Sequence, residues 1–436
     1  MDILEDLKYR GLINQVTNLE GLKKRLKKGK LVLYCGFDPT AKSLHIGNLL
    51  HLITLERFQM ANHQPIVLIG GGTGLIGDPS GKKTERPLNS LATVKEWKKE
   101  IAEQVKNIFS SSKNSVISSE ARKEVLPTKG RQVLIFLDNY EWLGKVKTID
   151  FLRDIGKYFT VPYMLAKESI KTRLESGISF TEFSYMVLQA FDFYHLAEKY
   201  HCELQIGGSD QWGNITAGVE LVKKKLNKAV FGLSTPLITK ADGTKFGKTA
   251  SGTIWLDAEL TSPYQFYQFW INTDDTDVIT FLKYFTFLFK DKIEKLATKV
   301  KQEPEKKLAQ KTLALEVTKL VHGGKAAEQA EKISQALFYG KIKSLTLKEL
   351  ETAFQDVPSF TLKNITKISL VDLLVKASIS SSKRQAREDI QDKIININGQ
   401  IFNQIDQTIS RSTYLHKKYL VIKRGKKNYY LVSWLN

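Results

Sequence analysis

The stretch LVLYCGFDPTAKSLHIGNLL, residues 31–50, joins a short apolar run to the start of a predicted helix. The apolar run predicts a buried strand, which ends at Gly36 and the Asp-Pro-Thr turn. After that turn, Ser43 is predicted to cap a helix whose first turn contains His45 and Asn48. A helix start presents unpaired backbone N–H groups and the positive end of the helix dipole. The stretch therefore predicts a site that binds an anion.

The segments that follow this stretch predict an α/β fold. A helical apolar period covers residues 48–60, and a second apolar run follows at residues 65–70. A strand, a helix and a strand within about 40 residues are what a right-handed parallel crossover requires. We therefore expect a doubly wound, Rossmann-like parallel sheet.

Composition limits the class of protein. The chain has 436 residues, of which 42% are hydrophobic and 26% charged, so it can fill the cores of two or three domains. Its net charge of +20 suggests a polyanionic partner. Cys35 and Cys202 have no C-x-x-C spacing, which disfavours a disulfide framework and a zinc site, and we expect no metal ligands. No run approaches a membrane span, so we expect a cytoplasmic protein without a membrane partner.

A glycine-rich segment follows the second predicted strand. Gly72, Gly74 and Gly77 match the dinucleotide fingerprint, which keeps a nicotinamide-dependent oxidoreductase open as an alternative. The fingerprint needs an apolar helix next, however, whereas this chain continues into a polar loop that also fails the Walker A pattern. The loop carries Lys82 and Arg86, and we interpret it as a basic loop beside a glycine-rich wall of a pocket. A solvated surface loop is the other reading of these residues.

The most informative helix opens with a capping-box pattern at Ser179 and Glu182. Tyr185, Gln189 and Asp192 then fall on one face of this helix, among many apolar side chains. A carboxylate and an amide in such surroundings are costly to bury without partners, and a polar ligand can supply them. Alternatively, Asp192 reaches solvent, as most polar helix residues do.

The chain next predicts a strand at residues 203–206 and a turn that carries Asp210 and Gln211. Open α/β sheets bind ligands at the carboxyl ends of their strands, where Asp210 suits a ribose hydroxyl. Simple helix capping by Asp210 is compatible with that role.

A glycine-rich loop at residues 239–249 holds Lys245 and Lys248, three residues apart. Two lysines on flexible stems can close over a polyphosphate. Taken alone the signal is weak, because lysine-rich loops are usually solvated.

The order of two motifs resembles a known family. Residues 45–48, HIGN, resemble the HIGH signature of class I aminoacyl-tRNA synthetases, and KFGKT in the later loop resembles their KMSKS signature. The surrounding sequence is most similar to bacterial tyrosyl-tRNA synthetases. This resemblance implies ATP-dependent attachment of tyrosine to tRNA(Tyr) through a tyrosyl-adenylate, with release of pyrophosphate and AMP.

The resemblance also implies residue roles. The catalytic residues would be Thr40, His45, Lys82, Arg86, Lys245 and Lys248. The tyrosine site would comprise Tyr34, Asp78, Tyr185, Gln189, Asp192 and Gln211. The ATP site would comprise Asp38, Thr40, His45, Gly47, Asn48, Asp210 and Lys248. Because Asn48 replaces the second histidine of the signature, it can donate a hydrogen bond but carries no charge.

The C-terminal segment differs in composition. From residue 361 onward the chain contains 14 Lys and Arg and 5 Asp and Glu. Two hairpins are predicted, the first with an Asn-Gly turn and the second with a basic tip. It resembles a small RNA-binding module of a ribosomal protein, with Lys383, Arg384 and Arg387 as the matching RNA-binding residues.

Four segments and a set of partners follow from the resemblance. We expect a catalytic domain with a dimer-forming insertion, a helical anticodon-side domain, a linker and the RNA-binding domain, at residues 1–235, 236–340, 341–365 and 366–436. The expected partners are ATP, Mg²⁺, L-tyrosine, tRNA(Tyr) and a second copy of the chain. Two alternatives stay open beside the oxidoreductase: a non-catalytic RNA-binding protein, and tryptophan as the amino acid.

Overall fold

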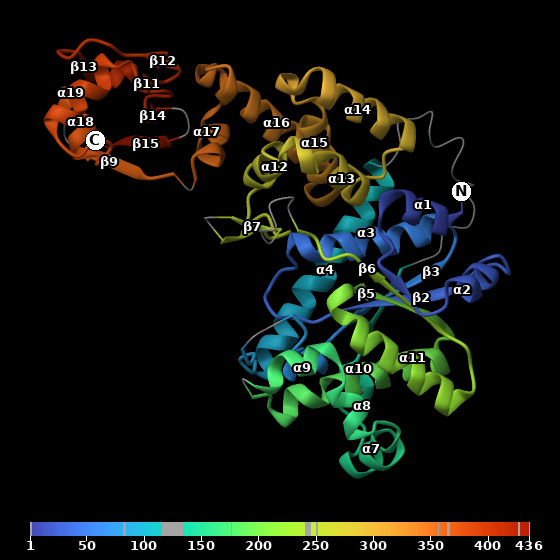
Figure 1. Ribbon diagram of the computed structural model, residues 1–436. Coiled ribbons are helices and arrows are strands. Elements are labelled where there is room, and N and C mark those ends of the chain that lie inside the picture. Colours follow the sequence, from blue (N-terminus) through green and yellow to red (C-terminus); the bar gives the residue numbers. More distant parts are fainter. Residues whose placement is uncertain are drawn as a thin grey trace. The chain divides into compact units, whose positions relative to one another are not determined.

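The computed structural model (Figure 1) describes residues 2–81, 84–115, 134–175, 177–239, 246–249, 252–355, 357–363, 367–425 and 428–435. Contacts divide the chain into two compact units. Unit 1 is Met1–Thr261 with Ile271–Val321, and unit 2 is Ser262–Trp270 with His322–Asn436. The end of the predicted helical domain and the predicted linker both fall in unit 2, together with the predicted RNA-binding domain.

Unit 1 is built on a six-stranded sheet. Its strands are β1 (Gln15–Val16), β2 (Val32–Phe37), β3 (Gln64–Ile69), β4 (Ile135–Asp138), β5 (Cys202–Gly208) and β6 (Phe231–Thr235). Their order is β1-β6-β5-β2-β3-β4, and β1 is antiparallel to β6 whereas the other pairs are parallel. The chain winds from β2 out to β4 and returns on the other side as β5 and β6, which confirms the doubly wound α/β class.

Helices cover both faces of this sheet (Figure 1). α3 (Ile46–Met60) packs on β2 and β3, while α10 (Phe180–Lys199) and α11 (Trp212–Leu226) pack together against β5. Parallel strands covered on both faces are apolar along their length, and β3 is buried at every position. On the side of α10, Tyr34 joins a core that includes Phe193 and Val222. This packing turns one face of β2 toward α10.

The start of α3 differs from the prediction. The helix begins at Ile46, and His45 is its N-cap in place of Ser43. The Nδ1 atom of His45 accepts from the Gly47 N–H at 3.1 Å, and the Asn48 side chain accepts from the His45 N–H at 3.1 Å. The hydroxyl of Ser43 instead donates to the carbonyl of the next residue at 2.7 Å. The same stretch also contains a longer strand than predicted, because β2 extends through the two residues after Cys35.

Unit 1 contains further helices besides α3, α10 and α11. They are α1 (Ile3–Arg10), α2 (Leu19–Leu26), α4 (Leu91–Ser115), α6 (Tyr140–Leu143), α7 (Thr148–Asp154), α8 (Val161–Leu165), α9 (Glu168–Leu174), α13 (Asp275–Phe285), α14 (Lys290–Gln302) and α15 (Leu308–His322). β4 lies at the edge of the sheet and pairs with β3. β1 was not predicted, because a two-residue strand has no measurable period. None of the described helices has the length and apolar character needed to cross a membrane.

Unit 2 combines helices with a small mixed domain. Its helices are α12 (Pro263–Ile271), α16 (Gly324–Phe338), α17 (Leu347–Ala353), α18 (Leu370–Lys376) and α19 (Lys383–Gln391). Its strands are β9 (Ser359–Lys363), β10 (Lys367–Ser369), β11 (Ile395–Ile397), β12 (Gln400–Ile401), β13 (Thr408–Ser410), β14 (Tyr419–Arg424) and β15 (Asn428–Leu435). Five of them form a sheet in the order β12-β11-β14-β15-β9. Asn398 and Gly399, both with positive φ, form the predicted hairpin turn between β11 and β12.

The segment predicted as a linker, residues 341–365, contains α17 and β9 and is therefore not an extended connection. β9 pairs parallel with β15, so it belongs to the small sheet. Ile333 of α16 and Leu350 of α17 share a core with Val421 of β14. Elements this short show little periodicity in sequence, and contacts with distant strands stabilise them.

Candidate active site

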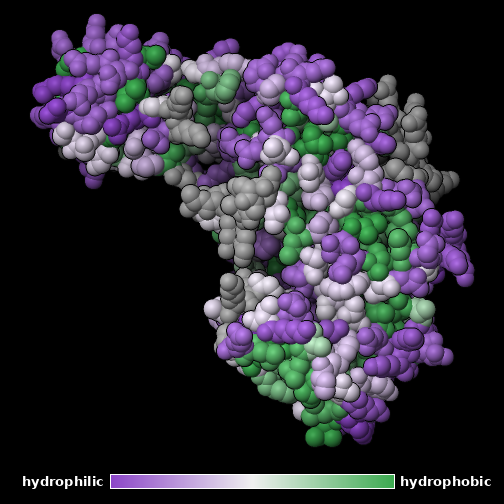
Figure 2. Space-filling view, in the orientation of Figure 1, coloured by the Kyte–Doolittle hydropathy of each residue, from purple (hydrophilic) through white to green (hydrophobic). Residues whose placement is uncertain are grey.

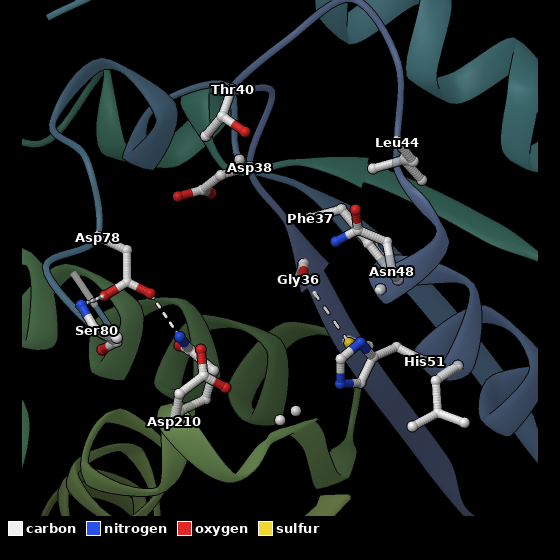
Figure 3. Close-up of a pocket in the computed structure, with 18 of the residues that line it drawn as sticks. Gly36, Phe37, Asp38, Thr40, Leu44, Asn48, His51, Asp78, Ser80 and Asp210 are labelled. Atoms are coloured by element: carbon white, nitrogen blue, oxygen red, sulfur yellow. Dashed lines mark hydrogen bonds between the residues drawn. The ribbon is translucent and has the colours of Figure 1, made fainter. Parts of the chain in front are cut away.

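A cavity of about 680 Å³ lies at the carboxyl ends of β2 and β5, where the winding of the sheet reverses (Figure 3). Figure 3 shows Asp38 and Thr40 beyond the end of β2, Asp78 and Asp210 on one side, and Asn48 on the other. The predicted residues that line this cavity are Tyr34, Asp38, Thr40, His45, Gly47, Asn48, Asp78, Arg86, Tyr185, Gln189, Asp192, Asp210 and Gln211. Segments far apart in sequence thus converge on one site, as expected for ligands at the switch point of a doubly wound sheet.

Tyr34 and Asp192 form one end of the cavity, which we name the phenol end. The Tyr34 hydroxyl is buried, and no hydrogen-bond partner for it exists among the described residues. The Asp192 carboxylate accepts from Trp142 Nε1 at 2.7 Å and from Asn139 Nδ2 at 2.8 Å. Burial raises the pKa of Asp192 to about 8, although both hydrogen bonds act in the opposite direction. A hydroxyl ligand that donates to Asp192 and accepts from Tyr34 would fit this end.

Asp38 and Tyr185 lie beside the phenol end. The Asp38 carboxylate accepts from Tyr185 Oη and from Thr73 Oγ1, each at 2.7 Å. Burial raises the pKa of Asp38 to about 6. Gln189 Oε1 accepts from Asn214 Nδ2 at 3.1 Å, which fixes the orientation of the amide. Asp38, which the resemblance assigns to the ATP site, thus contacts Tyr185, which the resemblance assigns to the tyrosine site.

Asp78 adds a further carboxylate to the cavity. It accepts from the Ser80 N–H at 2.9 Å and from Gln211 Nε2 at 2.5 Å. Burial raises its pKa, and the negative charge of Asp210 adds to the rise. Several buried carboxyl groups near one another favour a bound cation, because it relieves their repulsion. The amino group of an amino acid is such a cation.

The glycine-rich segment makes room for carboxylates. A Cβ atom at Gly70 would collide with Asp38, and one at Gly71 would collide with Asp138. Gly72 precedes a single 3₁₀ turn at Thr73–Leu75, Gly74 lies within it and Gly77 follows it. Residues 76–81 begin no helix whose N-terminus could bind a pyrophosphate. The segment therefore lacks the local structure that the oxidoreductase alternative requires.

The start of α3 forms the nucleotide end of the cavity. His45 is the N-cap of this helix, and Gly47 and Asn48 lie in its first turn, where the helix dipole favours phosphate. His51 also lines the cavity, one turn further along, with its Nε2 atom 3.2 Å from Thr235 Oγ1. Burial lowers the pKa of His51 to about 4, so it is neutral at neutral pH. His51 was not predicted, because a lone histidine in an apolar helix has no distinguishing spacing.

The two signature motifs meet in space. Ile46 N–H donates to the Ile254 carbonyl at 3.0 Å, and the Ile254 N–H donates to the Gly247 carbonyl at 3.0 Å. A Cβ atom at Gly247 would lie 2.5 Å from Ile46, so the KFGKT segment lies directly on the helix start. Lys82 and Lys245 lie outside the described residues, as does the side chain of Lys248, whose backbone belongs to β7 (Lys248–Thr249), the partner of β8 (Gly252–Thr253).

Glu182 holds Arg86 at the rim. Its carboxylate accepts from the Arg86 N–H at 3.0 Å and pairs with Arg173 at 2.9 Å, and both side chains of the ion pair are almost fully buried. Arg86 Nε also donates to the Asp78 carbonyl at 2.8 Å. The Ser179 hydroxyl accepts from the Glu182 N–H at 3.3 Å, which confirms this N-cap. The Glu182 side chain does not complete the predicted capping box, because Arg86 and Arg173 engage it.

The predicted RNA-binding residues lie in unit 2 on α19. Lys383, Arg384 and Arg387 are all exposed. Lys383 pairs with Asp372 at 2.8 Å, and Arg384 pairs with Glu388 at 3.0 Å. Exposed ion pairs of this kind contribute little to stability, so a phosphate can replace the carboxylate partner.

Two family models match the chain. Residues 24–339 match a family described as tRNA synthetases class I (W and Y), and residues 349–432 match a tyrosine–tRNA ligase SYY-like C-terminal domain. A tyrosine–tRNA ligase of Bacillus caldotenax is 56% identical over 435 residues, covering 100% of both chains. The chain belongs to the tyrosyl-tRNA synthetase family. Tyrosine–tRNA ligase 1 of Bacillus subtilis, another tyrosyl-tRNA synthetase, is 54% identical over 437 residues and 99% of both chains.

Solved structures of tyrosyl-tRNA synthetases have a similar fold. A C-terminally truncated mitochondrial enzyme of Aspergillus nidulans superposes with a TM-score of 0.69 at 31% identity, covering 77% of this chain and 94% of that one. A tryptophanyl-tRNA synthetase from Encephalitozoon cuniculi reaches a TM-score of 0.52 at 14% identity, over 80% and 93% of the two chains. That second similarity concerns the fold alone. Membership of the tyrosyl family confirms the resemblance drawn from the HIGN and KFGKT motifs.

Proposed function

We propose that this chain attaches tyrosine to tRNA(Tyr) at the expense of ATP, through a tyrosyl-adenylate. One observation carries the choice of amino acid. The Tyr34 hydroxyl is buried, has no hydrogen-bond partner among the described residues and lies near the Asp192 carboxylate at one end of the cavity. The other end of the cavity is a helix start. A tyrosine bound with its phenol at the first end directs its carboxylate toward the nucleotide. Tryptophan has no hydroxyl there and would leave Tyr34 and Asp192 without a ligand partner.

In the first step, an oxygen of the tyrosine carboxylate attacks the α-phosphorus of ATP. The bond between the α-phosphorus and the bridging oxygen breaks, and pyrophosphate leaves with its electron pair. No protein nucleophile is needed, so the residues act by positioning and by stabilising charge. Asp78, Tyr185 and Gln189 hold the amino group, and Gln211 lies next to the carboxylate. Asp38 is next to Tyr185 and supports the same group.

The nucleotide end stabilises the phosphates. Thr40, His45, Gly47 and Asn48 face the triphosphate, and Asp210 accepts from a ribose hydroxyl. Lys82, Arg86, Lys245 and Lys248 supply positive charge to the departing pyrophosphate, in the roles that the resemblance gives them. Lysine suits this role, because its ammonium group acts as a point charge on a long side chain.

Mg²⁺ accompanies ATP in this proposal. Polyphosphate oxygens are the ligands that Mg²⁺ prefers, and it is usually bound through them with few protein groups. Within the described residues, no cluster of three or more His, Cys, Asp and Glu is arranged as a metal site. We therefore assign no protein ligand to the ion, and we place the reaction in the cytoplasm, where tRNA is charged.

In the second step, a hydroxyl of the terminal adenosine of tRNA attacks the tyrosyl carbonyl and AMP leaves. The basic residues Lys383, Arg384 and Arg387 bind the tRNA backbone, because exposed cations of this kind favour phosphates over bases. Figure 2 supports this role, since the visible face of the small domain is mostly hydrophilic. A non-catalytic RNA-binding protein would have no reason to keep the cavity residues.

We also propose a homodimer formed through the segment between α7 and the start of α10. Large apolar side chains of this segment are exposed, and Figure 2 shows a hydrophobic area over α7 and α9. They are Ile149 at 72%, Leu152 at 52%, Val161 at 60%, Leu165 at 36%, Leu174 at 47% and Phe180 at 78% exposure. Apolar surfaces of this extent usually contact a protein partner. Sedimentation at the mass of one chain would contradict the dimer.

Tyrosine-dependent exchange of labelled pyrophosphate into ATP tests the proposed reaction. Purified protein with Mg²⁺ should catalyse exchange with tyrosine, and tryptophan should give none above the background without amino acid. Exchange needs only the first step, so it does not depend on the tRNA preparation. Absence of exchange at saturating tyrosine and ATP would contradict the proposed function, and exchange with tryptophan alone would contradict the amino-acid assignment.

A further inference from the structure

Two aromatic residues at the end of α16 are exposed in unit 2. The side chain of Phe338 is 81% exposed and that of Tyr339 is 63% exposed. Their ring centroids lie 5.0 Å apart with the planes perpendicular. Large apolar rings that remain this exposed on a folded surface commonly mark a contact with a partner.

The helix end beneath these rings is firmly held. The Tyr339 N–H donates to the Gln335 carbonyl at 3.0 Å, and the Lys341 N–H donates to the Ala336 carbonyl at 2.7 Å. Gly340 has φ +69°, the left-handed conformation that usually terminates a helix. Ala336 lies in the core formed with α17 and β14. The rings are therefore exposed at a fixed position on the surface of a packed helix.

Lysines follow the aromatic pair in the sequence. Residues 338–348 contain three lysines and no acidic residue, and the hairpin at residues 394–404 contains no acidic residue either. The two segments touch, because a Cβ atom at Gly340 would lie 3.4 Å from the Gly399 carbonyl. Lys343 Nζ donates to Gln400 Oε1 at 3.2 Å across the same contact. The pair, the lysines and the hairpin form one surface, which we name the aromatic platform.

We propose that unpaired nucleotides of the tRNA stack their bases on Phe338 and Tyr339 while the lysines of the aromatic platform contact the flanking phosphates. The proposal rests on the proposed function for the identity of the RNA. Aromatic side chains bind any base with a free face, and only unpaired bases offer one. A second copy of the chain would bring lysines against lysines, and a purely apolar protein partner would leave those lysines without counter-charges.

Substitution of both rings by leucine tests the stacking. F338L/Y339L keeps the apolar character and removes the π faces. We expect its Kd for tRNA(Tyr), measured by filter binding at fixed salt, to rise about 5- to 50-fold. The rate of tyrosine-dependent pyrophosphate exchange should stay at the wild-type value. F338W/Y339W should bind tRNA at least as tightly as wild type, because tryptophan restores stacking.

Phe289→Leu provides the matched control, since Phe289 is 48% exposed but lies in unit 1 before α14. Its tRNA affinity should not change. Lys341→Gln should reduce the dependence of log Kd on log salt by about one unit, as expected for a lost phosphate contact. A Kd for F338L/Y339L within twofold of wild type would overturn the proposal. An altered oligomeric mass of this variant without a change in its Kd for tRNA would overturn it too. Loss of pyrophosphate exchange by the wild-type chain would instead overturn the proposed function.

Discussion

At the phenol end of the cavity the polar groups are buried: Asp192 is bonded to neighbouring side chains, and the Tyr34 hydroxyl has no partner among the described residues. At the nucleotide end, by contrast, the polar groups belong to a helix start and to the segment around Arg86. Asp192 is held by Trp142 of α6 and by Asn139, which follows β4. At the other end, Arg86 is held by its backbone N–H, which donates to Glu182, and by its Nε, which donates to the Asp78 carbonyl. The predicted Lys82 and Lys245 lie outside the described residues. Recognition of the amino acid thus depends on groups fixed before it binds. We expect stabilisation of the departing phosphates to depend on the basic side chains predicted for the nucleotide end.

The largest expected effect comes from breaking the phenol end. We expect Asp192→Asn to lower kcat/KM for tyrosine by about 100-fold, because the hydroxyl loses a charged acceptor in a buried site. Discrimination against phenylalanine should also fall by at least about tenfold; tyrosyl-tRNA synthetases are themselves the standard example of this effect. Pyrophosphate exchange with each amino acid measures both quantities.

Asp138→Asn is the matched control for this change. Asp138 ends β4 and pairs with Lys98, but unlike Asp192 it does not line the cavity. Its tyrosine preference should equal that of wild type. An Asp192→Asn enzyme with unchanged preference over phenylalanine would remove Asp192 from the recognition of the phenol.

The second effect concerns pH. With a pKa of about 8, the Asp192 carboxyl of the free protein is mostly protonated at pH 6.5 and half ionised at pH 8. If the ionised form accepts from the substrate hydroxyl, binding of tyrosine releases a proton and tightens as the pH rises. We expect tyrosine affinity, measured by equilibrium dialysis, to increase about tenfold between pH 6.5 and 8. Phenylalanine should lack this dependence, and a flat tyrosine profile would contradict the assignment.

The smallest effect tests how the nucleotide end is supported. Glu182→Gln keeps an acceptor for the Arg86 N–H but removes the charge that faces Arg173. We expect the KM for pyrophosphate to rise about fivefold in the exchange reaction, with the Kd for tyrosine unchanged. Glu198→Gln, on the same helix but in contact with Tyr194 and Lys199 and not with Arg86, should change neither value. Equal losses in both constants would mean that Glu182 merely supports the fold.

Sequence patterns predicted the parts of the site that lie in single segments. The apolar strand with Tyr34 and the spacing of Tyr185, Gln189 and Asp192 on one helix placed all four residues correctly at the cavity. Local spacing carries this information because strand and helix periods decide which side chains share a face.

Contacts between distant segments were not predictable. Trp142 lies 50 residues before Asp192 in sequence, and no pattern links an indole N–H to a carboxylate at that separation. His45 is the N-cap in place of Ser43, whose hydroxyl accepts from the distant Gln104 and Asp257. α17 and β9 likewise owe their order to the small sheet. In each case the deciding interaction comes from residues that the local sequence does not contain.

The glycine-rich segment shows how a contact between distant residues restricts the residue type at a position. Gly70 has no functional group, yet its missing side chain is the space that the Asp38 carboxylate occupies. Any larger residue at Gly70 would push an acid out of a pocket whose chemistry depends on that acid. Substitutions at Gly70 therefore act by displacing the Asp38 carboxylate. Natural or engineered variants at Gly70 should be grouped with variants of Asp38.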